Sequence, residues 1–334
     1  MKRAQIHGPG DLRLDDVAEP ELGPKDVILT VGACGICGSD VGYVRVGGVA
    51  GPTPDPMPIG HELAGTISSV GSEVSNDLLG FRVALNPMTA GYAIGNGGTE
   101  GGFCSDLLVR DATLGRNLFP IPDDMPFQIA ALAEPLGVGM NAVDRVSVSP
   151  GEKVAVMGAG PIGLAAIATM LDRGIENIVA VDLSSARLDV ARKLGVPETI
   201  NPTGVDTWEE LARLHGTMSF YGAELTQTNV FIEASGSPAV LSQIIEHARP
   251  ESRVSIVALH RQPIEVNFMI VMMKQMTIQG AMEYPRRFED MIELLGRRDL
   301  SPMITHEFGL DDFIEAFDIA QSPNAGAKVM IDFA

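Results

Sequence analysis

The 334-residue sequence is poor in cysteine, aromatic residues and positive charge: it has three cysteines, one tryptophan and only 24 lysines and arginines against 43 acidic residues. Three cysteines are too few and odd in number for a disulfide framework, so a reducing cytoplasm is the simplest compartment. The net charge of -19 argues against a nucleic-acid-binding face, which needs clustered lysine and arginine. It suits a small, uncharged or weakly polar substrate.

Long apolar runs are missing as well. No stretch approaches the roughly 20 apolar residues that span a bilayer. Residues 1–13 lack the apolar segment of a secretory signal. We therefore expect no membrane partner. With 45% hydrophobic residues the chain is typical of a globular protein, and its length favours two domains.

The first 130 residues or so have the pattern of strands and loops. Residues 26–32 (DVILTVG) and 63–70 (LAGTISSV) alternate as half-buried strands do. Residues 47–60 and 86–102 are so rich in glycine, with proline in the first, that we expect loops there. This part is predicted to be mostly β.

After Pro150 strands and helices alternate, which predicts a parallel sheet covered by helices on both faces. A helix over 288–295 and a terminal strand over 328–332 follow that sheet. The expected strands of the sheet are 153–157, 178–181, 230–234, 254–258 and 276–279, and the expected helices are 162–171, one from Ser184 or Ser185 to Leu194, and one opening at Ser237-Pro238.

A dinucleotide-binding motif lies between the first strand and helix of that pattern. Gly158-Ala159-Gly160-Pro161-Ile162-Gly163 matches G-x-G-x-x-G. Gly158 allows the tight turn, Gly160 lets the backbone approach a pyrophosphate, and Gly163 lets the helix pack on the sheet. The helix N-terminus then faces the phosphates.

Asp182 ends the next strand, at the distance where an acid accepts hydrogen bonds from a ribose. Its carboxylate would repel a 2′-phosphate, so we predict NAD rather than NADP as cofactor. Arg187 is the opposing signal, because an arginine there can accept that phosphate. Its place one helical turn further on favours a solvent-facing side chain.

Four residues have the chemistry of a catalytic metal site: Cys37, His61, Glu62 and Glu134. One thiolate, one imidazole and a carboxylate give three protein ligands and leave a position for water or substrate, as a catalytic zinc requires. Taken singly, a cysteine is more often a small buried hydrophobe, and a histidine is more often structural. The spacing of these residues alone leaves open both a metal site and purely structural roles.

The motifs together resemble a known family. Gly35-Ile36-Cys37-Gly38-Ser39-Asp40, Gly60-His61-Glu62, Ala133-Glu134-Pro135-Leu136 and the glycine motif occur in order along the chain. On these motifs the sequence is identified as a member of the zinc-containing medium-chain dehydrogenases, in the branch of butanediol, sorbitol and threonine dehydrogenases.

The resemblance implies an α/β protein: a Rossmann doubly wound parallel sheet plus a mostly-β catalytic domain like GroES (chaperonin-10). We expect the catalytic domain to comprise residues 1–135 and 281–334, and the NAD-binding domain to comprise residues 136–280.

The same resemblance assigns roles to the site residues. Cys37, His61 and a glutamate bind zinc, and that glutamate is either Glu62 or Glu134. Asp40 orients His61, and Ser39 contacts the alcohol oxygen and passes its proton outward. The enzyme would then transfer a hydride between an alcohol and NAD.

Two departures from the family change those expectations. Relatives often hold a second, structural zinc with four clustered cysteines, but residues 86–102 contain none and Cys104 stands alone after them. We therefore predict one catalytic zinc and no structural zinc. The family often has a proton-relaying histidine where this chain has Gly42, so the proton must leave by another route.

The substrate is less well defined by the sequence. Polyol dehydrogenases commonly have an arginine before the tyrosine that here is Tyr284, but this chain has Glu283. A small secondary alcohol, vicinal diol or acyloin is therefore favoured over a polyol. Tyr43, Phe103 and Tyr284 are candidates for the substrate pocket, with packing roles as the alternative.

Two further expectations concern class and assembly. A zinc-free NAD-binding protein with a degenerate site is the alternative from another functional class. By analogy with relatives we expect a homodimer or homotetramer, in which the strand at 276–279 pairs across a two-fold axis.

Overall fold

The computed structural model describes residues 1–89, 92–285, 287–322 and 326–333. The chain divides into two compact units. The first unit comprises Met1–Glu134, Arg287–Gly296 and Ile304–Ala334, and the second comprises Pro135–Arg286 and Arg297–Met303.

This division differs from the expected one over residues 281–285 and 297–303, which belong to the second unit. Two side chains of residues 297–303 explain why this segment belongs to the second unit. Arg297 forms an ion pair with Asp172 at 2.8 Å, and Arg298 donates a hydrogen bond to the carbonyl of Leu194.

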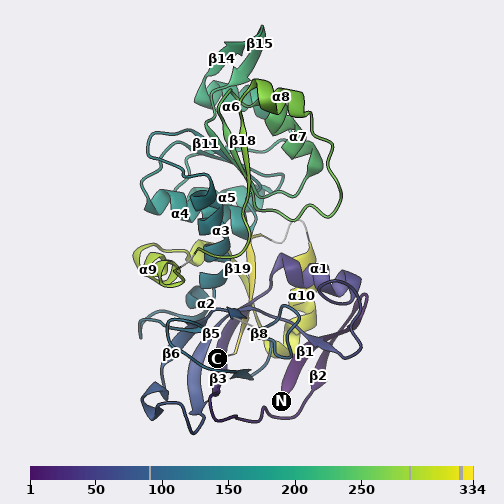
Figure 1. Ribbon diagram of the computed structural model, residues 1–334, viewed down its shortest axis with the longest axis vertical. Coiled ribbons are helices and arrows are strands. Elements are labelled where there is room, and N and C mark those ends of the chain that lie inside the picture. Colours follow the sequence, from purple (N-terminus) through teal and green to yellow (C-terminus); the bar gives the residue numbers. More distant parts are fainter. Residues whose placement is uncertain (90–91, 286, 323–325, 334) are drawn as a thin grey trace. The chain divides into compact units, whose positions relative to one another are not determined.

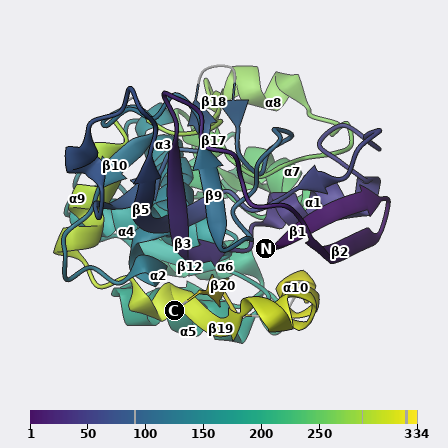
Figure 2. The same ribbon diagram turned by 90° about the horizontal axis from the view of Figure 1, so that it is seen from below.

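The first unit is built on a sheet in the order β10-β6-β5-β3-β20-β19. Its central strand, β3 (Val27–Gly35), pairs antiparallel with β5 (Glu62–Val70), with β9 (Asp106–Val109) and with the terminal strand β20 (Lys328–Asp332) (Figure 2). The end of the chain therefore lies beside residues near its beginning.

Strands β6 (Arg82–Leu85), β10 (Leu118–Pro120) and β19 (Ile304–Gly309) complete this sheet. The other elements of the unit are β1 (Lys2–Gly8), β2 (Asp11–Asp16), α1 (Gly38–Val46), β4 (Met57–Pro58), η1 (Asn76–Leu78), β7 (Met88–Thr89), β8 (Tyr92–Ala93), α2 (Phe127–Ala130), α9 (Glu289–Arg297), η3 (Leu310–Asp312) and α10 (Phe313–Gln321).

Alternation along β3 explains how this unit forms a core. Val27, Leu29 and Val31 are buried, whereas Ile28 and Thr30 between them are more exposed. The buried set packs with apolar residues of β1, β5 and α10 in one cluster. The predicted period of two is confirmed for this strand.

The second unit contains a parallel sheet in the order β13-β12-β11-β16-β17-β18 (Figure 1). This is the order of a dinucleotide-binding fold, whose two halves meet where the order reverses, between β11 and β16. The strands are β11 (Val154–Met157), β12 (Ile178–Val181), β13 (Glu198–Ile200), β16 (Val230–Glu233), β17 (Arg253–Ile256) and β18 (Thr277–Gly280).

Helices connect these strands, and right-handed crossovers place those of the two halves on opposite faces. The helices are α3 (Ala133–Arg145), which begins in the first unit, α4 (Pro161–Asp172), α5 (Ser185–Leu194), α6 (Thr207–His215), α7 (Pro238–His247), α8 (Phe268–Met273) and η2 (Ser301–Met303); a hairpin, β14 (Thr217–Phe220) and β15 (Ala223–Thr226), precedes β16.

The predicted α/β class, with a mostly-β first unit and a doubly wound parallel sheet in the second unit, is confirmed. Strands β12 and β20 have the predicted bounds, but the hairpin β14–β15 and helices α3 and α10 were not predicted. Within the described residues, no helix is both long and apolar enough to cross a membrane.

Candidate metal and dinucleotide sites

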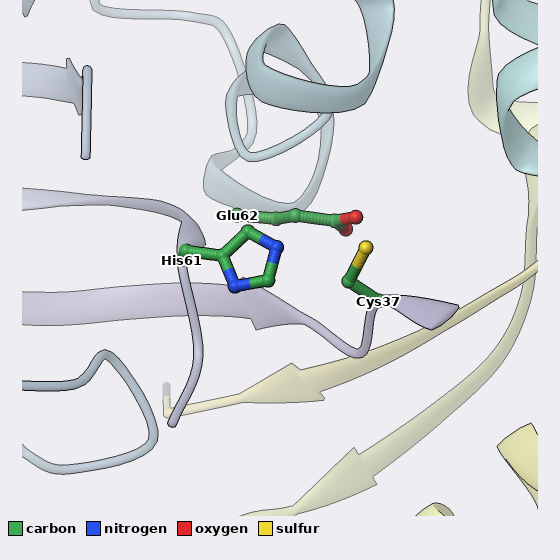
Figure 3. Close-up of side chains that lie close together, drawn as sticks. All are labelled: Cys37, His61 and Glu62. Carbon is green, nitrogen blue, oxygen red and sulfur yellow. The ribbon is translucent and has the colours of Figure 1, made fainter. Parts of the chain in front are cut away.

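Three of the predicted metal ligands come together in the first unit. The ligand atoms of Cys37, His61 and Glu62 all lie within 4.8 Å of one another. Figure 3 shows one ring nitrogen of His61 directed toward the Cys37 sulfur and the Glu62 carboxylate. Cys37 precedes α1, His61 directly precedes β5, and Glu62 is the first residue of β5. The fold thus assembles a sulfur, a nitrogen and an oxygen donor.

The start of α1 holds Cys37 in place. Cys37 is the N-cap, and its Sγ accepts a hydrogen bond from the backbone N–H of Ser39 at 3.5 Å. Asp40 completes the capping box, because its Oδ2 accepts from the Cys37 N–H at 2.9 Å. Its Oδ1 lies 3.4 Å from His61 Nδ1. The fully buried Asp40 side chain therefore contacts both predicted ligands.

Negative charge dominates around His61. Burial by itself lowers the pKa of this imidazole, but the charges of Asp40 and Cys37 and their hydrogen bonds outweigh burial and raise the pKa well above 6.5. The surroundings therefore favour a positive charge at this ring. A metal cation satisfies the same preference, and the donor set of sulfur, nitrogen and oxygen fits zinc.

Lys328 lies at this cluster, and the sequence analysis did not identify it. Its Nζ is 2.7 Å from Glu62 Oε1 and 2.5 Å from Oε2, and it donates to the Ile36 carbonyl at 3.1 Å. The Lys328 side chain is 1% exposed and that of Glu62 is fully buried. Gly35 makes room, since a Cβ there would lie 2.3 Å from Glu62 Oε2.

The ion pair favours the charged form of Lys328. Burial lowers the pKa of Lys328, but the nearby charges of Glu62 and Cys37 outweigh burial and raise it above 10.5. The charge of Glu134 contributes in the same direction, so this carboxylate also lies near the ammonium group. Glu134 is 7% exposed, near the start of α3, and is not a member of the three-residue ligand group.

The expected contact residues have different surroundings. Ser39 Oγ lies 3.3 Å from His61 Nε2, and the Tyr43 hydroxyl donates to Asn96 Oδ1 at 3.0 Å. Phe103 is fully buried, with its ring 4.8 Å from that of Phe313, so its role is core packing rather than lining an open pocket. Tyr284 follows β18 in the second unit and is half-buried.

The glycine motif of the second unit has the geometry expected of a dinucleotide turn. Gly158 has φ +104°, and a Cβ there would lie 2.8 Å from the backbone of Ala234. A Cβ on Gly163 would lie 1.9 Å from the Gly158 carbonyl oxygen. Both positions therefore require glycine.

Gly160 differs from the other two glycines. A Cβ there would meet nothing within 4 Å, and Gly160 is the N-cap of α4 without a side-chain cap. Pro161 and Ile162 form the first helical residues after it. The open space and the uncapped helix N-terminus fit a pyrophosphate.

Asp182 follows β12 beside this turn. Its Oδ2 accepts from the Ala159 N–H and its Oδ1 from the Ser184 N–H, both at 2.7 Å. Arg187 lies on the first turn of α5, where its backbone N–H donates to the Ser184 cap. These bonds fix the carboxylate of Asp182 at the carboxyl end of the sheet, where dinucleotides bind.

Buried Glu233, at the end of β16, supports the same turn and was also missed. Its Oε1 accepts from the N–H groups of Ser235 and Gly236, and its Oε2 is 2.8 Å from His260 Nε2. These bonds shape the loop against which Gly158 packs. In the sequence Glu233 directly follows the apolar residues of a buried strand, and no motif marks it as functional.

Two family models match most of the chain. Residues 23–123 match the family model of the alcohol dehydrogenase GroES-like domain, and residues 161–297 match that of zinc-binding dehydrogenase. Sorbitol dehydrogenase of Mus musculus is 33% identical, over 98% of this chain and 94% of its own length.

Solved structures extend the similarity. The 2R,3R-butanediol dehydrogenase of Bacillus subtilis is 28% identical with a TM-score of 0.86, covering 100% of this chain and 99% of the other. An E. coli CFT073 structure described as a short chain alcohol dehydrogenase, complexed with NADH, is 25% identical with a TM-score of 0.86, with the same coverage.

Proposed function

Because the chain belongs to the zinc-containing medium-chain dehydrogenase family, we propose that it transfers a hydride between a small secondary alcohol, vicinal diol or acyloin and NAD. The convergence of Cys37, His61 and Glu62 carries this proposal. The family membership establishes a zinc-dependent alcohol or polyol oxidoreductase that uses a nicotinamide cofactor.

Cys37 and His61 hold the metal in this proposal, together with one carboxylate. Glu62 has the position for it, and its pairing with Lys328 makes Glu134 the alternative ligand. A thiolate and one carboxylate balance the two charges of the ion. When bound, zinc supplies a Lewis acid that lowers the pKa of a bound alcohol, and the nicotinamide takes up the hydride.

The other residues orient the groups that react. The Asp40 carboxylate lies 3.4 Å from Nδ1 of His61, on the far side of the ring from the Cys37 sulfur, and so leaves Nε2 for the metal. Ser39 Oγ, 3.3 Å from Nε2, accepts the hydrogen bond of the substrate hydroxyl and begins the removal of its proton. Gly42 offers no side chain to continue that path.

The test is metal analysis of the purified protein together with an NADH absorbance assay. We expect one zinc per chain, and oxidation of a vicinal butanediol faster than of sorbitol, threonine or a cyclic secondary alcohol. Preference for sorbitol would favour a polyol dehydrogenase, which the mouse relative supports. A protein that binds NADH but holds no metal even when supplied with excess zinc would contradict the proposal and favour a degenerate NAD-binding protein.

The anchored carboxylate of Asp182 supports NAD as the preferred cofactor. A 2′-phosphate would approach this carboxylate, and such like-charge contacts cost several kcal/mol. We expect Asp182→Ala to reduce the preference for NAD over NADP by about 10²-fold, measured as the ratio of the two kcat/KM values.

Asp189→Ala is the matched control for that measurement. It removes an acid from an exposed position of α5, where Asp189 pairs with Arg192, and should leave the ratio unchanged. A native protein that prefers NADP would contradict the assignment of Asp182 and would favour a phosphate-binding role for Arg187.

We also propose a homodimer or homotetramer. Strand β18 is the outermost strand of its sheet, and the neighbouring helix α8 exposes Phe268 and Met272 by about 70% and 67%. A second copy that continues the sheet would cover this apolar surface. The three free cysteines support a reducing compartment, and we propose the cytoplasm.

A further inference from the structure

A short loop over residues 94–100 packs directly against the segment that carries His61. Gly95 has φ +65°, and a Cβ there would lie 2.1 Å from the carbonyl oxygen of Gly60. Asn96 forms a β-bridge with Ile59, and the Gly95 N–H donates to the Glu100 carbonyl at 2.7 Å. This 94–100 loop lies in the stretch where relatives often carry zinc-binding cysteines, as noted above.

The Asn96 side chain is fixed by two hydrogen bonds. Its Nδ2 donates to the carbonyl of Ile94 at 3.4 Å, which directs Oδ1 away from its own turn. The Tyr43 hydroxyl donates to that Oδ1 at 3.0 Å. An amide oxygen only accepts, so this contact defines where the phenolic hydrogen lies.

Tyr43 connects the loop to the catalytic serine. It lies one turn after Ser39 on α1, so both side chains share a helix face. Burial raises the pKa of Tyr43, the charge of His61 lowers it, and the nearby Ser39 side chain lowers it to a smaller extent. The phenol therefore stays protonated at neutral pH. With its hydrogen directed to Asn96, only its lone pairs face Ser39.

The direction of each hydrogen follows from these contacts. Ser39 has two acceptors within reach, the Tyr43 oxygen and Nε2 of His61. When a metal occupies the lone pair of Nε2, the Ser39 hydrogen has the Tyr43 oxygen as its partner. The lone pairs of Ser39 then remain available to a substrate hydroxyl.

We propose that Asn96 is a positioning residue: it fixes the Tyr43 hydrogen and thereby orients Ser39 as the hydrogen-bond acceptor for the alcohol. This inference rests on the proposed role of Ser39. It gives the 94–100 loop, which has no cysteine to bind metal, a part in orienting the reacting groups.

A double-mutant cycle tests the proposal in the zinc-loaded enzyme. Asn96→Leu keeps the size of the side chain but removes the acceptor, and should lower kcat about 3- to 10-fold, the usual effect of one hydrogen bond. Asn96→Asp keeps an acceptor and should retain near-native kcat. In a Tyr43→Phe background Asn96→Leu should have no further effect. Exposed Asn76→Leu is the control and should not change kcat.

A second measurement does not depend on turnover. The chain has four tyrosines, so absorbance titration can follow Tyr43, identified by its loss in Tyr43→Phe. Asn96→Asp should raise the pKa of Tyr43, because a carboxylate accepts more strongly from the phenol and repels the phenolate.

Two results overturn the inference. One is a decrease in kcat caused by Asn96→Leu that is equally large in the native protein and in the Tyr43→Phe background. The other is an unchanged pKa of Tyr43 in Asn96→Asp. Absent turnover in a native protein that binds zinc and NAD would instead contradict the proposed function, and the titration still decides whether Asn96 holds the Tyr43 hydrogen.

Discussion

Cys37→Ser and His61→Ala are each expected to lose bound zinc and to lower kcat/KM for the alcohol by at least about 10³-fold. The Lewis acid contributes several kcal/mol to the transition state, and each 1.36 kcal/mol is a factor of ten. The affinity for NADH should change little, because the glycine turn and Asp182 belong to the other unit. Zinc content, kcat/KM and NADH fluorescence measure the three effects.

Cys104→Ser is the matched control for the loss of a thiol. Cys104 is fully buried, its Sγ donates to backbone carbonyls at 3.2 and 3.4 Å, and a serine hydroxyl can do the same. This variant should keep its zinc and its activity. If Cys37→Ser also kept both, the zinc mechanism at this site would be wrong.

Lys328→Met is expected to lower the free energy of unfolding of the metal-free protein by about 3–5 kcal/mol, the usual cost of breaking a buried ion pair. The substitution leaves the fully buried carboxylate of Glu62 without its cation. Urea denaturation followed by circular dichroism measures the difference. The variant should still fold, because methionine fills the space of the aliphatic part of lysine.

Two further variants show whether the missing charge of Lys328 causes the lower free energy of unfolding. Lys328→Met combined with Glu62→Met removes both charges and should be more stable than Lys328→Met alone. Lys2→Met breaks the exposed ion pair with Asp311 and should leave the unfolding free energy nearly unchanged. A loss of similar size in Lys2→Met, or no recovery in the double variant, would contradict this account of Lys328.

Much of the fold and of the two sites was predictable from local patterns. Glycine, proline and apolar periodicity act over a few residues, so they located β12, α5 with its Ser184 cap, and the turn at Gly158. Short motifs identified Cys37 and His61 for the same reason, because the residue type and its neighbours in the chain carry the chemistry.

Local patterns left other points open. Phe103 was a candidate for the substrate pocket with packing as the alternative, and its ring packs on that of Phe313, which lies far along the chain. Helices α3 and α10 were not predicted. Gly137 and Gly139 lower the helix propensity of α3, whereas the buried Phe313, Ala316 and Phe317 of α10 do have helical spacing. In each case, packing against distant residues decided the outcome.

The amino-acid sequence by itself determined the donor chemistry of the metal site, the dinucleotide turn and the acid beside it, since these depend on residues close together in the chain. Only the tertiary structure decided that Lys328 faces Glu62 and that Asn96 faces Tyr43. Strands β20 and β5 both pair with β3, which brings Lys328 to Glu62, 266 residues earlier in the chain. Packing of Gly95 on Gly60 places Asn96 beside Tyr43. Contacts of that kind leave no periodic signal, because they form only once a sheet and its loops have assembled around a common core.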